Sequence, residues 1–90
     1  MSDATHHARS GAAEIEFLRA ELLTGLTLSK IAREARHEEK RNRNRLNARK
    51  AYDSILHFMQ KANVGSEELN DIRSKLEQLR SELRLLGEAV

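Results

Sequence analysis

The chain of 90 residues contains no cysteine, proline or tryptophan, and its formal net charge is only +2. Without cysteine it forms no disulfide and no cysteine-based zinc site, and it has no thiolate nucleophile. Its hydrophobic residues are mostly leucine and alanine, whereas strand-forming valine, isoleucine, phenylalanine and tyrosine are scarce. The composition predicts one small, all-helical domain.

The N-terminal residues 1–11 are small and polar and show no apolar period, so we expect a flexible tail there. A first helix is predicted over about residues 12–36, with Ser10 as its N-cap. Its apolar positions form two adjoining stripes. One stripe comprises Ile15, Leu18, Leu22 and Leu26, and the other comprises Phe17, Ala20, Thr24, Leu28, Ile31 and Ala35. So wide an apolar face predicts a helix packed against two neighbours.

Gly25 lies in the middle of this first helix. A glycine in a helix interior costs about 1 kcal/mol relative to alanine, and Thr27 offers an alternative cap at which a new helix would begin. Because the apolar pattern stays in phase across Gly25, we predict a continuous helix in which this glycine lets another helix approach closely.

A second helix is predicted over about residues 38–62, after a short turn around His37. Its apolar positions follow a regular 4-3-4-3 spacing: Ala48, Tyr52, Ile55, Met59 and Ala62. A glycine-containing break at residues 63–65 separates it from the third helix.

The third helix is predicted over about residues 66–86, and Gly87 ends it. It carries the most regular apolar stripe of the chain: Leu69, Ile72, Leu76, Leu79, Leu83 and Leu86. Short connections imply antiparallel neighbours, so the predicted fold is all-α, an up-down-up three-helix bundle over residues 12–87. The stripe of the third helix is predicted to be core, and the alternative is a coiled-coil seam with a second copy of the chain.

Two residue spacings in the sequence resemble those of known metal or catalytic sites. Glu34 and His37 have the Glu-x-x-His spacing of di-iron proteins, but those sites need two such motifs and further carboxylates. Asp53 and His57 are placed for an ion pair on one helix face, while Ser54 points away from both, so the three residues make no catalytic relay. We therefore expect no catalysis, no cofactor, no metal site and no small-molecule substrate.

The positive charge is concentrated in residues 36–50, which carry seven cationic side chains and only two carboxylates. On a helix, Arg41, Arg45 and Arg49 line up along one face. The candidate residues for binding an anion or a partner are Arg41, Arg43, Arg45, Arg49 and Lys50. Such a stripe suits phosphates, although the segment contains no aromatic residue on which a base would stack.

These patterns favour a small non-catalytic module that binds another protein or itself through its helix faces. A bundle that binds nucleic acid through residues 41–50 is the alternative. The sequence shows neither the features of a signal peptide nor an apolar run long enough to span a membrane, so we expect a cytoplasmic protein.

Overall fold

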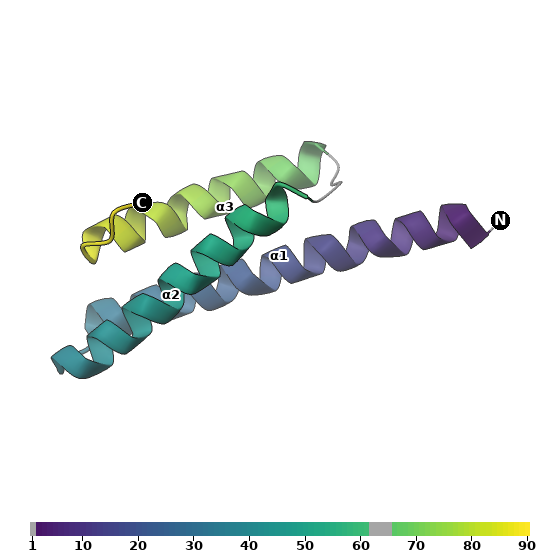
Figure 1. Ribbon diagram of the computed structural model, residues 1–90. Coiled ribbons are helices and arrows are strands. Elements are labelled where there is room, and N and C mark those ends of the chain that lie inside the picture. The colour runs from purple at the N-terminus through teal and green to yellow at the C-terminus, as the bar shows by residue number, and fades with distance from the viewer. Residues whose placement is uncertain (1, 62–65) are drawn as a thin grey trace.

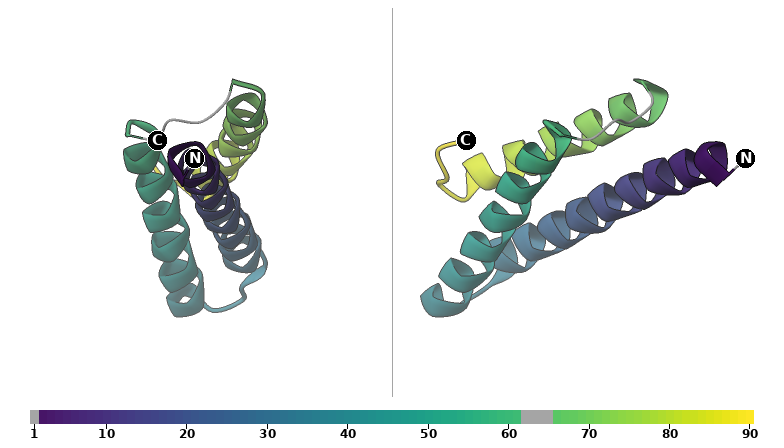
Figure 2. Two further views of the ribbon diagram at one scale, coloured as in Figure 1. Left: turned by 90° about the vertical axis from the view of Figure 1, so that its right-hand side faces the viewer. Right: turned by 45° about the vertical axis from the view of Figure 1, so that its right-hand side comes forward.

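The computed structural model describes residues 2–61 and 66–90 of the chain. This part forms three helices, α1 (Ser2–Glu34), α2 (Glu38–Met59) and α3 (Ser66–Leu85). In Figures 1 and 2, α1 and α3 run in the same direction and α2 runs in the opposite one. The molecule is elongated, with extents of 55 × 18 × 17 Å. The prediction of an all-α, up-down-up three-helix bundle is confirmed.

The first helix begins at Ser2, not near residue 12, so Ser10 lies inside α1 and is not its N-cap. No proline interrupts residues 2–11, so nothing in this segment breaks the helix. Figure 1 shows this first part of α1 projecting beyond α2 and α3. The predicted flexibility of the segment concerns its motion and stays a prediction.

The other helix boundaries lie close to the predicted ones. α2 begins at Glu38, and His37 precedes it in an extended conformation with φ −102° and ψ 133°. Glu38 and Glu39 occupy the first turn, where they favour the N-terminus of the helix. α2 ends at Met59, three residues before the predicted end at Ala62, and Gln60 and Lys61 form a turn. The predicted break at residues 63–65 lies outside the described residues.

At Gly25, side chains of α2 and α3 both lie close to the backbone of α1. α1 continues through it without a break, as predicted. A Cβ atom on Gly25 would lie 2.7 Å from Leu79 Cδ2 on α3 and 3.5 Å from Ala51 Cβ on α2. No ordinary Cβ contact is as short as 2.7 Å, so the absence of a side chain is what allows this approach. The predicted role of Gly25 is confirmed.

α1 packs more extensively against α2 than against α3, and small residues line the seam. Beyond Gly25, the buried residues of α1 are Ser29 and Ala32, and they match Ala48 and Ala51 of α2. Ser29 is 1% exposed, and its Oγ has no hydrogen-bond partner among the described residues. Its small volume, rather than its hydroxyl group, therefore explains its place in the seam.

The predicted second stripe of α1 is wrong for three of its members, because Phe17, Ala20 and Thr24 are exposed. Its other members, Leu28, Ile31 and Ala35, are half-buried, and Leu28 packs against the core. The buried line runs instead from the first stripe into the small residues: Leu18, Leu22, Gly25, Ser29 and Ala32. A pattern of large apolar residues misses this line because its second half contains almost none.

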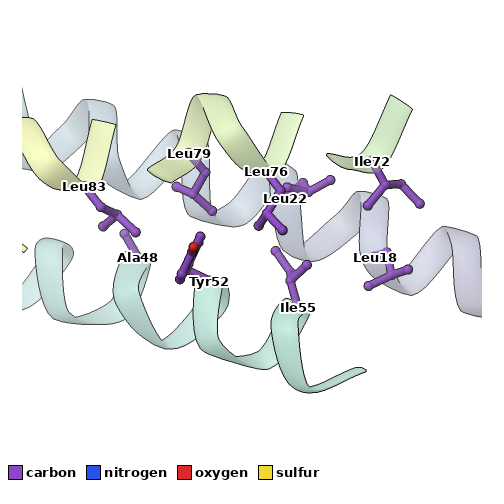
Figure 3. Packing of buried hydrophobic residues seen from close by; sticks show 9 residues of the cluster. All are labelled: Leu18, Leu22, Ala48, Tyr52, Ile55, Ile72, Leu76, Leu79 and Leu83. Atoms are coloured by element: carbon purple, nitrogen blue, oxygen red, sulfur yellow. The ribbon is translucent and has the colours of Figure 1, made fainter. Parts of the chain in front are cut away.

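α3 covers the α1–α2 pair with large side chains. Four residues of its stripe are fully or nearly buried: Ile72, Leu76, Leu79 and Leu83. Figure 3 shows them pointing toward the α2 residues Ala48, Tyr52 and Ile55, and toward Leu18 and Leu22 of α1. The predicted core role of the stripe is confirmed, and the coiled-coil alternative fails because these residues are already buried within one chain.

We expect Gly25→Val to lower the free energy of unfolding by about 1–3 kcal/mol, because its methyl groups must displace the buried Leu79. Thr24→Val is the matched control, since it places the same side chain at the neighbouring, exposed position and should change stability by less than about 0.5 kcal/mol. Urea unfolding followed by circular dichroism measures both. Equal losses in the two variants would contradict the tight approach at Gly25.

Candidate functional site

The structure divides the five predicted anion- or partner-binding residues among three environments. Arg45 and Arg49 converge on one carboxylate, that of Glu88, beyond the end of α3. Arg41 is exposed, and its Nη2 donates to the carbonyl oxygen of Ala35 at 3.4 Å, next to the α1–α2 turn. Arg43 and Lys50 are exposed and make no ion pair with a described residue.

Each oxygen of Glu88 faces one arginine. Arg49 Nη1 donates to Oε1 at 3.0 Å, and Arg45 Nε lies 3.3 Å from Oε2. The second contact is an ion pair without hydrogen-bond geometry, because Arg45 Nε has no hydrogen-bond partner among the described residues. The Glu88 side chain is only 13% exposed, so the two arginines cover most of its surface.

Arg49 lies between two carboxylates. Its Nε donates to Asp53 Oδ1 at 3.1 Å, one helical turn further along α2. The hydrogen bond that Arg49 donates to Asp53, followed by the one that it donates to Glu88, raises the pKa of Arg49 above its ordinary value. The sequence suggested that Asp53 pairs with His57, and this is wrong, since Asp53 faces the arginine that precedes it. Two of the three aligned arginines are thus neutralised within the chain.

The turn after α3 places Glu88 over α2. Gly87 has a φ of +93°, in the left-handed region that favours glycine. The N–H of Gly87 donates to the carbonyl of Arg84, and the N–H of Glu88 donates to that of Leu83, each at 3.0 Å. This pair of bonds is the Schellman motif. It turns the C-terminal segment back, as Figure 1 shows, and Val90 packs at the edge of the core.

An apolar groove between α1 and α3 is a second candidate surface, and the sequence did not single it out. Its apolar side chains all come from α1, and the most exposed of them is Leu23, which is 68% exposed. The groove holds a pocket of about 140 Å³. Its lining residues are Arg19, Leu22, Leu23, Leu26, Lys75 and Gln78.

Ion pairs join α1 and α3 at two places, one at the groove and one further along both helices, beyond its lining residues. At the groove, Arg19 Nη2 lies 3.8 Å from Asp71 Oδ2, and the same oxygen lies 3.7 Å from Lys75 Nζ. Further along, Arg33 Nη1 donates to both carboxylate oxygens of Glu82, at 2.8 and 2.9 Å. These two charged contacts hold α3 beside α1.

The sequence did contain a signal for this groove. Leu23 falls outside both apolar stripes predicted for the first helix, yet it stands next to Leu22 and three residues before Leu26. Residues three apart share a helix face, so the three leucines widen the apolar surface toward α3. In the sequence, an apolar surface that lies outside the core is visible only as extra apolar residues beside the predicted core stripe.

The remaining chemical candidates do not assemble into a reactive site. Glu34 and His37 are both exposed around the α1–α2 turn. His57 lines an open hollow with Glu14, Phe58 and Lys61. Among the side chains that the structure describes, those of residues 13–61 and 67–90, no group of three or more histidine or acidic residues is arranged to hold a metal ion. No helix in this part of the chain is long and apolar enough to cross a membrane.

We expect Glu88→Gln to lower the urea midpoint of unfolding, because both arginines lose their shared carboxylate. In the Arg45→Gln, Arg49→Gln background the same change should have a much smaller effect, since interacting residues are not additive. Glu16→Gln is the control: Glu16 is exposed and makes no ion pair with a described residue. Equal effects of Glu88→Gln in both backgrounds would contradict the contact.

No protein-family model, no curated protein and no solved structure matches this chain.

Proposed function

We propose that the protein is a small, non-catalytic interaction module of the cytoplasm, which binds another protein through the groove between α1 and α3. The observation that carries this proposal is the exposure of Leu23 beside the half-buried Leu26 in an open apolar groove. A large apolar side chain in such a setting gains free energy when a partner covers it.

The size of the groove favours a protein partner over a small molecule. Its pocket of about 140 Å³ is smaller than the roughly 300–1,000 Å³ of ordinary ligand pockets. Its lining residues on α1 run from Arg19 to Leu26, a span of about 10 Å at 1.5 Å per residue. A shallow apolar surface of this kind suits the apolar side chains of a helix laid against it.

Nucleic-acid binding is the second candidate, supported by the exposed Arg43 and Lys50. These residues are seven positions apart, so they share one face of α2. Three observations weaken this candidate. Arg45 and Arg49 are occupied by Glu88, Arg41 is engaged at the α1–α2 turn, and Asn44 Nδ2 donates to the carbonyl of Lys40 at 2.8 Å. Little of the predicted phosphate-binding stripe is left.

The protein-binding proposal is tested by photo-crosslinking in the organism that encodes the chain. We expect p-benzoylphenylalanine in place of Leu23 to give a covalent adduct with a different protein. The same label in place of Leu46, which is 51% exposed on α2, should give none. Adducts from position 46 but not from position 23, or from neither, would refute the proposal. Adducts of the chain with itself alone would favour self-association.

The nucleic-acid candidate predicts binding of duplex or single-stranded DNA or RNA at about 50 mM salt, where electrostatic binding is strong. Under this candidate, Arg43→Gln with Lys50→Gln should weaken binding more than Arg45→Gln with Arg49→Gln, because only the first pair has no carboxylate partner. We expect no measurable binding by the parent chain in an electrophoretic mobility shift. If the parent chain binds nucleic acid and the Arg43→Gln, Lys50→Gln variant loses more binding than the Arg45→Gln, Arg49→Gln variant, nucleic-acid binding becomes the favoured function.

A further inference from the structure

The side chains around the α1–α3 groove carry an excess of positive charge. Two of its lining residues, Arg19 and Lys75, are cationic, and no lining residue is acidic. Both cations contact a single carboxylate, that of Asp71, which compensates only one of them. The groove is therefore apolar at its floor and positively charged at its edge.

A third cation extends this charge along α1. Lys30 follows Leu26 by four residues and Leu23 by seven, so it lies on the same face of the helix. It is exposed and makes no ion pair with a described residue. The acidic residue of α1 between the two ion pairs is Glu21, and its spacing from Leu23 and Leu26 places it on the side away from α3. The positive edge thus runs along most of the groove.

The same charges argue against a second copy of the chain as the occupant. In a two-fold dimer formed through this groove, each copy would place its surface against the identical surface of the other. Arg19, Lys30 and Lys75 of one copy would then meet the same cations of its partner. Like charges brought together at an interface cost free energy, so the groove favours a different molecule.

The dimensions of the groove set the size of the occupant. The lining residues of α1, from Arg19 to Leu26, span about 10 Å, which corresponds to roughly two turns of a helix at 5.4 Å per turn. α1 and α3 run in the same direction in both views of Figure 2. A further helix in the groove between them would complete a four-helix arrangement, in which apolar side chains of the newcomer cover the leucines of α1.

We infer that the groove binds an acidic amphipathic helix of a partner protein, about two turns of which lie on the groove. Its apolar face covers Leu23 and Leu26, and its aspartate or glutamate side chains pair with Lys30, Lys75 and Arg19. This inference rests on the proposed function and adds the chemistry of the partner to it.

Two designed peptides of about 16 residues test the inference. Both carry leucine at helical spacing, and they differ only in flanking glutamate or flanking lysine. We expect the full chain to raise the fluorescence anisotropy of the glutamate peptide to saturation at about 50 mM salt, and to bind the lysine peptide at least tenfold more weakly. Equal binding of both peptides, or no binding of either, would overturn the inference.

Variants of the chain locate the site. Leu23→Ser should weaken binding of the glutamate peptide by about tenfold, the factor that corresponds to 1.4 kcal/mol, and Lys30→Gln with Lys75→Gln should also weaken it. Leu46→Ser and Lys50→Gln, which make the same changes on α2, should leave it unchanged. Circular dichroism checks that each variant is folded. Equal losses in the α2 variants would place the peptide elsewhere and overturn the inference.

The outcomes separate the inference from the proposed function. A crosslinked partner at position 23 without binding of the glutamate peptide would leave the interaction module standing and reject the acidic helix. Sedimentation equilibrium tests whether the groove instead binds a second copy of the chain. We expect the chain to be a monomer at all concentrations. A dimer that Leu23→Ser abolishes would show that the groove takes a second copy, and would overturn the inference.

Discussion

The close approach of α3 to α1 at Gly25 is the constraint on which the other contacts depend. Because Gly25 has no side chain, Leu79 of α3 reaches the α1 backbone at the level where Ala51 of α2 also packs. Beyond Gly25 the buried residues of α1 are small, Ser29 and Ala32, so this half of α1 supplies little bulk to the core. The large side chains of α3 fill that space instead. α3 therefore lies along the α1–α2 pair, and its edge beside α1 forms the apolar groove.

Much of this fold was predictable because large apolar residues repeat with the helical period. The stripe of α3 and the continuity of α1 at Gly25 both followed from such spacing. The second half of the α1 seam did not, because Ser29 carries no hydrophobic signal and Ala32 only a weak one. The first residues of α1 were missed for a related reason, since a helical segment without an apolar face looks like a tail.

The candidate sites depended on contacts that no local pattern encodes. Glu88 stands 39 positions beyond Arg49 in the chain, and only the packing of α3 and the turn at Gly87 bring the two together. Residues 36–50 therefore look more cationic in the sequence than they are in the fold. The groove beside α1 shows the converse, because its cations are spread over two helices and form no cluster in the sequence. Cations that are far apart in the sequence thus lie together at the groove, whereas the cations that cluster in the sequence at residues 36–50 are partly neutralised in the fold.

The ion pairs of α3 are distributed unevenly along its length. Near Gly87, the helix is held to α1 by the bidentate Arg33–Glu82 contact and to α2 through Glu88. Near Ser66, the contact to α1 is the longer and more exposed Arg19–Asp71 pair. Local opening of a protein begins where its tertiary contacts are weakest. We therefore expect α3 to move about its C-terminal end, so that the groove widens first near Arg19. A partner helix that enters the groove there displaces α3 at the lowest cost in free energy. As the partner helix docks, α3 returns toward α1.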